Sequence, residues 1–172
     1  MYNNRKINII VATELNGGIG YKNQLPWPKI PEDIKWFKEK TLGNIVIMGR
    51  NTAESIGHLL PDRHNVIITS SFPRQILEKS PNQPHSVYNN LSLALKMITE
   101  HPIIGKVFII GGAQLYQSAM DMKIVDRIYQ TLIQKPYQSD THFNLPDKFD
   151  LTWDSKLLEQ CKGFEKILWV KL

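Results

Sequence analysis

The sequence predicts an α/β fold: a central, mostly parallel mixed β-sheet of about eight strands, with helices on both faces and an antiparallel hairpin at the C-terminus. Three observations lead to this prediction. Short β-branched runs recur along the 172 residues, helical patterns separate several of them, and the C-terminal segment has the pattern of two strands around a turn. No linker, repeat or low-complexity segment divides the chain, so we expect a single domain over residues 1–172.

The predicted strands are continuous apolar runs, which is the pattern of parallel strands that are buried on both faces. The C-terminal hairpin is expected to turn at Lys162 and Gly163. The other strands are expected at residues 7–14 (INIIVATE), 44–49 (NIVIMG), 65–70 (NVIITS), 106–110 (KVFII) and 127–133 (RIYQTLI).

Helical patterns lie between some of these strands. Pro31 suits the first position of the first helix, and Ser92 is the expected N-cap of the second. The segment 71–90 is polar and rich in proline, so we expect mostly surface loop there. The predicted helices cover residues 31–41, 91–101 and 113–122.

Composition excludes several classes of function. The formal charge is +5, from 21 basic and 16 acidic residues, but the lysines and arginines are scattered, so we expect no nucleic-acid partner. Cys161 is the sole cysteine and the five histidines lack metal-ligand spacing, which argues against a disulfide and a metal site. No apolar run is long enough to span a bilayer and no secretory signal is evident, which predicts a cytoplasmic protein without a membrane partner.

Two adjacent acids begin the first predicted helix, where the helix dipole favours negative charge on both. At roughly 100° per residue, Ile34, Trp36 and Phe37 define the apolar face of this helix. Asp33 falls in the middle of that face, whereas Glu32 points to the polar side. A carboxylate on an apolar face loses hydration unless something binds it, so Asp33 is the candidate for ligand binding or proton transfer. Dipole matching alone also explains the pair, and the residues leave both interpretations open.

Turns that carry glycines or hydroxyls follow three of the predicted strands. The motif MGRNT places Gly49 in a tight turn and offers a cation and a hydroxyl, Arg50 and Thr52, beside helix N-terminal amides. IIGGAQLY repeats the arrangement with Gly111 and Gly112, and ITSS ends a third strand with hydroxyls. The spacing is not GxGxxG, so the ordinary Rossmann fingerprint is not supported. Open α/β sheets bind ligands at this edge, although tight strand–helix packing also explains the glycines.

Taken together and in order, these motifs resemble the dihydrofolate reductase family over nearly the whole chain. The resemblance is carried by IVATELNGGIGYKNQLPW, PEDIKWFKEKT, VIMGRNTAESIG, LPDRHNVIITSS, VFIIGGAQLY and DTHF. It implies an enzyme that reduces dihydrofolate to tetrahydrofolate with a hydride from NADPH, in support of one-carbon metabolism. It also implies a monomer whose small-molecule partners are dihydrofolate and antifolate inhibitors such as trimethoprim and methotrexate.

For the substrate, the resemblance assigns one acid and the residues around it. Asp33 matches the family's single acidic active-site residue, which binds the pterin and promotes its protonation. Trp27 matches a tryptophan that holds a water near that carboxylate, and Thr131 matches the threonine that hydrogen-bonds it. Arg63 matches the arginine that binds the α-carboxylate of the glutamate tail, a bidentate pairing suited to guanidinium. The expected apolar contacts are Ile10, Phe37, Ile56 and Leu60.

For NADPH, the resemblance implies contacts at the glycine turns. Arg50 and Ser70 would recognise the 2′-phosphate, and Gly111–Gly112 matches a pair joined by a cis peptide bond. The loop from Glu14 to Trp27 would close over the nicotinamide and exclude water. The full expected set of cofactor contacts is Ala12, Ile19, Gly49, Arg50, Asn51, Thr52, Thr69, Ser70, Ile110, Gly111, Gly112, Ala113, Gln114, Leu115, Tyr116 and Thr141.

Three features depart from the family's pattern: two substitutions, and one residue added at Pro28–Lys29 to the usual bacterial spacing between the loop tryptophan and the acid. Ala53 stands where many bacterial members carry tryptophan, and Gln114 replaces a frequent basic residue, which removes one cation near the 2′-phosphate. Two alternatives to a dihydrofolate reductase follow from the residues. A related reductase of the same fold, such as a pyrimidine reductase of riboflavin synthesis, would not need both Asp33 and Arg63. A nucleic-acid-binding module would leave an acid on an apolar face unexplained.

Overall fold

The strands and helices alternate along the chain much as the sequence predicts. The molecule is described by a computed structural model over residues 5–101, 103–147 and 149–172. The strands of the main sheet are β1 Ile7–Glu14, β3 Ile45–Gly49, β4 His64–Ile68, β5 His85–Tyr88, β6 Val107–Gly111, β7 Val125–Ile133, β9 Trp153–Cys161 and β10 Phe164–Lys171. A second small sheet pairs β2 Gly18–Gly20 with β8 Thr141–His142. The helices are α1 Pro31–Thr41, α2 Arg50–Ile56, α3 Arg74–Glu78, α4 Leu91–Glu100 and α5 Ala113–Asp121.

The main sheet has eight strands in the order β5-β4-β3-β6-β1-β7-β10-β9. Neighbouring strands are parallel apart from β10, which pairs antiparallel with both β7 and β9. The predicted mixed, mostly parallel sheet with a C-terminal antiparallel hairpin is therefore confirmed.

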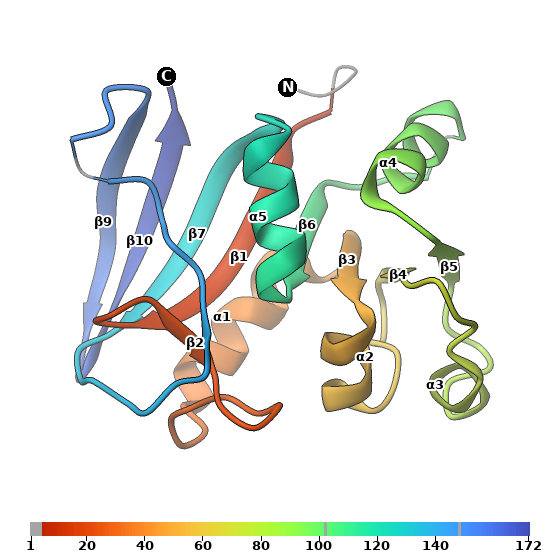
Figure 1. Ribbon diagram of the computed structural model, residues 1–172, viewed down its shortest axis with the longest axis horizontal. Coiled ribbons are helices and arrows are strands. Elements are labelled where there is room, and N and C mark those ends of the chain that lie inside the picture. The colour runs from red at the N-terminus through yellow and green to blue at the C-terminus, as the bar shows by residue number, and fades with distance from the viewer. Residues whose placement is uncertain (1–4, 102, 148) are drawn as a thin grey trace.

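Alternate residues of the strands pack against helices on opposite faces of the sheet. Ile45 and Ile47 belong to the core cluster shared with α4 and α5. Val46 and Met48 point to the other face, where they pack with α2 and α3. Helix α1 covers that second face through Trp36. Figure 1 shows α5 in front of the sheet and α1 behind it, so the predicted coverage of both faces is confirmed.

The segment 71–90 is more regular than predicted. It contains α3, whose Ile76 and Leu77 are buried against the α2 side of the core, and the edge strand β5. The prediction of mostly surface loop holds for the residues outside these two elements, but it missed α3 and β5. Such short elements carry too few apolar residues to give a clear periodicity, and the polar, proline-rich composition masks them.

The helix starts follow local capping rules, with one difference from prediction. Helix α1 begins at Pro31, as expected. Helix α4 is capped by Asn90, whose side-chain oxygen accepts a hydrogen bond from the backbone N–H of Leu93 at 2.8 Å. Ser92 lies inside the helix, so its assignment as N-cap is wrong. The extended backbone of Asn90 is what lets its oxygen reach the third helical amide.

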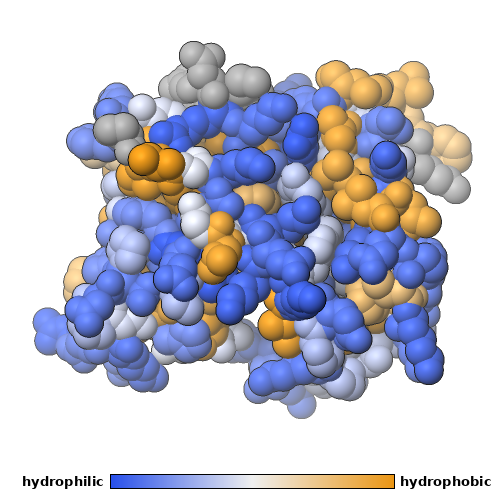
Figure 2. All heavy atoms as spheres, turned by 180° about the vertical axis from the view of Figure 1, so that it is seen from behind, coloured by the Kyte–Doolittle hydropathy of each residue, from blue (hydrophilic) through white to orange (hydrophobic). Residues whose placement is uncertain are grey.

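The C-terminal hairpin turns at Lys162 and Gly163, as predicted. Gly163 has a φ of +87°, a conformation that glycine adopts without steric cost. Its outer strand, β9, is the edge of the sheet and is exposed along most of its length. In Figure 2, apolar side chains gather on the side of this hairpin, whose exposed residues include Leu157 and Leu158. None of the helices in the described ranges is long and apolar enough to cross a membrane.

Candidate active site

Helix α1 brings Asp33 into contact with strand β7. The hydroxyl of Thr131 donates a hydrogen bond to Asp33 Oδ1 at 2.6 Å. Thr131 is buried and Asp33 is half-buried. Burial raises the pKa of Asp33, while the hydrogen bond from Thr131 and the charge of Lys166 oppose that rise. Two residues that the sequence assigned to one site, 98 positions apart in the chain, therefore meet there.

The apolar face of α1 is narrower than predicted. Trp36 is buried and Phe37 is half-buried, and both pack in a cluster with Ile10. Ile34 is 49% exposed, so its assignment to the apolar face is wrong. The buried stripe runs along the spacing i, i+3 and i+4 from Asp33, and Ile34 falls just outside it.

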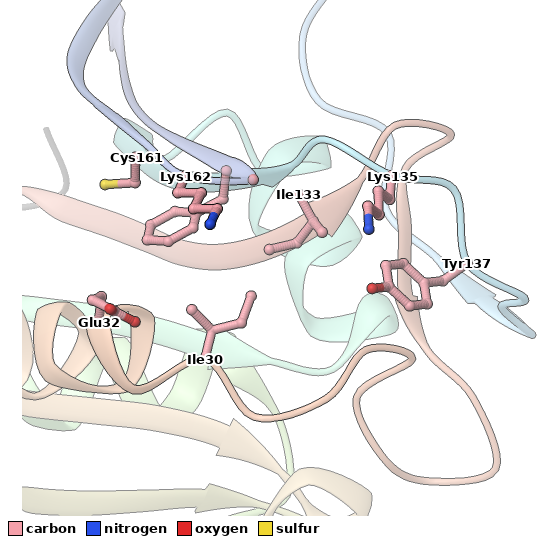
Figure 3. Close-up of a pocket in the computed structure, with 9 residues that line it drawn as sticks. Ile30, Glu32, Ile133, Lys135, Tyr137, Cys161 and Lys162 are labelled. Atoms are coloured by element: carbon pink, nitrogen blue, oxygen red, sulfur yellow. The ribbon is translucent and has the colours of Figure 1, made fainter.

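Glu32 lies in different surroundings from Asp33. It is exposed and lines an open groove of about 240 Å³ between the start of α1 and the β9–β10 turn. In Figure 3, Glu32 and Ile30 lie on one side of this groove, and Cys161 and Lys162 lie on the other. The expectation that Glu32 is a surface acid is therefore confirmed.

Trp27 lies in the loop that leads into α1. Its side chain is 4% exposed, packs with Ile133 and meets the Tyr137 ring edge-on at a centroid distance of 6.2 Å. Ala12 packs against the same cluster and is the register partner of Thr131. This cluster therefore lies beside the strand position that contacts Asp33.

Arg63 lies at the opposite end of α1 from Asp33. It donates hydrogen bonds from Nε to the carbonyl oxygen of Pro61 at 2.8 Å and from Nη1 to Thr41 Oγ1 at 3.1 Å. Arg63 is 5% exposed, yet no carboxylate of the described residues forms a salt bridge with it. A guanidinium carries five N–H donors, so most of its hydrogen-bonding capacity is left for a ligand.

Asn65 holds the loop that carries Leu60 and Arg63. Its amide accepts from the backbone N–H of Leu60 at 2.9 Å and donates to the carbonyl oxygens of Leu60 at 2.9 Å and Arg63 at 3.0 Å. The residue is fully buried. Sequence reasoning missed it, because an asparagine at the start of a strand has the ordinary composition of a turn.

The two glycine turns meet at the carboxyl ends of β3 and β6. Met48 and Gly111 are register partners in these neighbouring strands. A Cβ on Gly49 would lie 3.8 Å from the carbonyl oxygen of Gly111, and a Cβ on Gly111 would lie 3.0 Å from Thr52 Oγ1. The Gly111–Gly112 peptide bond is cis, as the resemblance implies. The absent side chains therefore leave a cradle lined by the backbone of the two turns and by the side chain of Thr52, to which α5 adds its N-terminal amides.

Arg50 contacts Ser71, the neighbour of the serine that the resemblance assigns to the 2′-phosphate. Its guanidinium donates hydrogen bonds to the hydroxyl of Ser71 and to the Glu54 carboxylate, while Ser70 is exposed next to this contact. Thr69 Oγ1 donates to the carbonyl oxygen of Ser71 at 3.0 Å and fixes the turn after β4. The motif ITSS contains both serines, and the sequence alone gives no signal that distinguishes them.

Tyr116 forms a hydrogen bond with the backbone of β1 at Ile10, a residue expected to contact the substrate. Its hydroxyl donates to the carbonyl oxygen of Ile10 at 2.8 Å, and its ring packs on Phe143 at a centroid distance of 4.9 Å. Burial raises the pKa of this phenol, so it stays neutral.

The remaining expected contacts lie on the elements around these turns. Ile110 packs against both the α1 cluster and the α2 cluster, and Leu115 is buried in the core while Gln114 is exposed. The others are Asn51 and Ile56 on α2, Leu60 after it, Gly112 before α5 and Ala113 at its start. Within the described residues, no group of three or more His, Cys, Asp or Glu side chains is arranged to hold a metal ion.

The loop between β1 and α1 is fastened by the segment around β8. Thr141 is the register partner of Gly20. Asp140 donates its backbone N–H to the carbonyl oxygen of Gly20 at 2.9 Å, and its carboxylate accepts from the backbone N–H of Lys22 at 2.8 Å. Ile19 packs against the main core from within this loop.

Glu14 is a buried acid at the base of the same loop that sequence reasoning missed. It is 1% exposed, and its Oε1 accepts from the backbone N–H of Gly18 at 2.7 Å. Its Oε2 has no hydrogen-bond partner among the described residues. A Cβ on Gly18 would lie 2.2 Å from Ser139 Oγ, so the loop packs tightly here. A glutamate at the end of a strand is expected to be exposed, because acidic residues are rarely buried, so the sequence did not predict the burial of Glu14.

Known proteins resemble this chain over most of its length. A family model described as dihydrofolate reductase matches residues 6–164. The chain is 36% identical over 160 residues to the dihydrofolate reductase of Bacillus subtilis (strain 168), and the match covers 93% of this chain and 87% of that protein. It is 38% identical over 149 residues to dihydrofolate reductase type 3 of Salmonella typhimurium, covering 86% of this chain and 82% of that protein. It is 34% identical over 143 residues to dihydrofolate reductase type 9 of Escherichia coli, covering 81% and 76%.

Proposed function

The chain belongs to the dihydrofolate reductase family and reduces dihydrofolate to tetrahydrofolate with a nicotinamide cofactor, and on that premise we propose the role of each side chain in the site. The observation that carries the proposal is the hydrogen bond between Thr131 and Asp33. It fixes one oxygen of a half-buried carboxylate and leaves the other for a ligand.

Asp33 binds the pterin through its free oxygen Oδ2, which accepts hydrogen bonds from the ring's amino group and a ring nitrogen. Thr131 occupies Oδ1 and so sets the orientation of the carboxylate. Because burial raises the pKa of Asp33, the acid takes up a proton more readily than a surface aspartate. Asp33 thereby promotes protonation of the ring nitrogen beside the carbon that is reduced, through a water that Trp27 holds.

The glutamate tail of the substrate extends along α1 toward Arg63. Asp33 and the Arg63 partner Thr41 are 41 − 33 = 8 positions apart in the helix, which corresponds to roughly 12 Å along its axis. A pterin bound at one end and a carboxylate bound at the other require such a separation. Ile10, Phe37, Ile56 and Leu60 supply the apolar surface between the two ends.

We infer that the cofactor is NADPH. The backbone cradle at Gly49, Gly111 and Gly112 fits a phosphate that approaches the main chain closely. Arg50, with the hydroxyls of Ser70 and Ser71, provides the charge for the 2′-phosphate that distinguishes NADPH from NADH. Tyr116 and Ala12 border the nicotinamide, which supplies the hydride when it is bound. The remaining expected contacts at the turns and at Thr141 complete this half of the site.

The loop from Glu14 to Trp27 covers the nicotinamide and excludes water during the reaction. Its attachment to the segment Asp140–Thr141 supports this role, since backbone hydrogen bonds hold it over the site. We propose that the chain functions as a monomeric single domain in the cytoplasm, and that antifolates compete with dihydrofolate at Asp33.

The test mixes the protein with NADPH and dihydrofolate and follows the absorbance of the reduced nicotinamide. We expect turnover, and a roughly 10²- to 10⁴-fold lower kcat for Asp33→Asn at neutral pH. Lower pH should restore part of this loss, because the substrate then arrives protonated. The matched control is Glu32→Gln, which changes the neighbouring exposed acid and should leave kcat and KM near wild type. Full activity of Asp33→Asn at neutral pH would contradict the assigned role.

A further inference from the structure

Strand β10 places a cation next to the residue that holds Asp33. Lys166 is the register partner of Thr131 across the β7–β10 pair. Side chains of directly opposed residues point to the same face of a sheet, with Cβ atoms about 5 Å apart. Thr131 in turn donates its hydrogen bond to Asp33. Lys166 therefore lies one side chain away from the acid.

Two contacts hold the Lys166 ammonium over α1. It forms an ion pair with Glu159 at 2.7 Å, and it lies 5.7 Å from the centroid of the Trp36 ring. Trp36 is three positions after Asp33 and lies on the same side of the helix. The Lys166 side chain is 12% exposed, whereas that of Glu159 is 57% exposed. Solvent therefore screens the charge of Glu159 more strongly than the charge of Lys166.

We propose that Lys166 is a positioning residue for Asp33: its ammonium is a fixed positive charge that favours the ionised form of this acid, and Glu159 weakens that charge. The inference rests on the proposed role of Asp33 in proton delivery. Neither Lys166 nor Glu159 is among the site residues expected from the sequence.

Other titratable groups lie on the elements that pack around Lys166 and Asp33. Helix α1 contributes Glu39 and Lys40, and the Lys40 ammonium lies 5.5 Å from the centroid of the Tyr129 ring on β7. Strand β9 contributes Glu159 and Cys161 beside Lys166. Glu32 lines the groove between the start of α1 and the β9–β10 turn, across from Cys161.

Of these groups, Lys166 is the one whose charge acts on the acid and lowers the pKa of Asp33, against the larger effect of burial. The hydrogen bond to Glu159 raises the pKa of Lys166. The ammonium therefore stays charged throughout the range in which Asp33 titrates, and its field does not vary with pH.

The test measures the titration of the Asp33 carboxyl by carbon-13 NMR in the ligand-free protein, with the resonance assigned by its loss in Asp33→Asn. Lys166→Met removes a cation that favours the carboxylate, so the midpoint should move to higher pH. Glu159→Gln removes the anion that offsets Lys166, so the midpoint should move to lower pH. A purely structural role of the pair would not shift the midpoint in opposite directions.

Two further variants act as controls. Lys166→Arg keeps the charge and should keep the midpoint near that of wild type. Lys156→Met removes an exposed cation from the same hairpin and should not move it. An unchanged or lower midpoint in Lys166→Met would overturn the proposal. If that variant does not fold, Glu159→Gln decides, because an unmoved or higher midpoint there overturns it equally.

The pH profile of kcat separates this inference from the proposed function. Delivery of a proton at Asp33 requires its protonated form, so the falling limb of the profile should move with the NMR midpoint in both variants. If Asp33→Asn were fully active, the proposed function would fail even though the midpoints still moved. If the midpoints stayed fixed while Asp33→Asn was inactive, the function would stand and the role of Lys166 would be wrong.

Discussion

The two halves of the proposed site, one for the pterin substrate and one for the dinucleotide, are built from different parts of the residues. On the proposed pterin side, the side chains of Asp33, Thr131 and Arg63 carry the hydrogen-bonding groups. On the proposed dinucleotide side, Gly49 and Gly111 contribute by having no side chain, so that Gly49 packs against the backbone of Gly111 and Gly112, and Gly111 packs against the side chain of Thr52. The first half depends on which groups are present, and the second depends on which atoms are absent. Substitutions should therefore weaken the first half group by group, and the second by filling space.

The largest effect in this comparison is expected from Arg63→Leu. Hydrogen bonds to a charged group contribute roughly 1.5–3 kcal/mol each, so losing a bidentate pair should raise KM for dihydrofolate on the order of 100-fold. Steady-state kinetics with a dihydropterin that lacks the glutamate tail provide the control, because that substrate has no carboxylate to lose. Equal losses with both substrates would show that Arg63 supports the fold and not the tail.

Gly111→Ala should damage the dinucleotide side. Gly111 has a φ of +134°, which L residues rarely adopt, and a new Cβ would lie 3.0 Å from Thr52 Oγ1. The new Cβ should displace this turn from the position that would hold the cofactor, so binding of NADPH should become roughly 10- to 100-fold weaker, measured by fluorescence titration. The matched control is Gly43→Ala, where φ is +69° but no atom lies within 4 Å of the new Cβ. Equal NADPH affinity in the two variants would contradict the cradle.

Arg50→Gln tests whether a side chain contributes to the dinucleotide side as well. The variant loses the cation beside Ser71 and should bind NADPH roughly tenfold more weakly, while its affinity for NADH stays unchanged. Gln114→Lys should act in the opposite direction, because it adds a cation at an exposed position of α5, beside the Gly111–Gly112 turn. A loss of affinity for NADH equal to that for NADPH would show that Arg50 does not read the 2′-phosphate.

The smallest effect concerns the stability of the pterin side. Burial holds the pKa of Asp33 above its ordinary value of 3.8, so the folded state binds a proton more tightly than the unfolded state does. Binding of this proton raises the free energy of unfolding. The contribution is complete below the pKa that Asp33 has in the unfolded state, and it is lost as the pH rises through the pKa that Asp33 has in the folded state. At neutral pH the ionised acid therefore destabilises the fold, and Asp33→Asn should unfold at higher urea concentration. The difference should shrink in mildly acidic buffer, whereas Glu32→Gln should show no such pH dependence.

Much of the fold follows from local patterns. The buried strands, the start of α1 at Pro31 and the turn at Gly163 all depend on residues close together in the chain. Periodicity also separated Glu32 from Asp33, because burial of a helix face is a local property. It failed for Ile34, which lies at the margin of that face, and for α3 and β5, which are too short to show a period.

The site itself depends on distant partners. Asp33 contacts Thr131, which is 98 positions later in the chain, and Gly18 packs against Ser139 from another part of the chain. No rule of sequence spacing predicts either contact. The resemblance to known reductases supplied most of the expected residues. It did not supply Lys166, Ser71 or Glu14, whose roles depend on what this chain places around them.

Glu14 bears on the free energy of opening the loop from Glu14 to Trp27, which we propose covers the nicotinamide. With the loop in place, one carboxylate oxygen is bound by the Gly18 N–H, while the other is buried without a partner among the described residues. Hydration of that oxygen on opening offsets part of the free energy lost when the loop leaves β8. For the loop movement that we propose, this effect would bring the covered and uncovered forms closer in free energy, so that substrate entry and product release would need no external trigger.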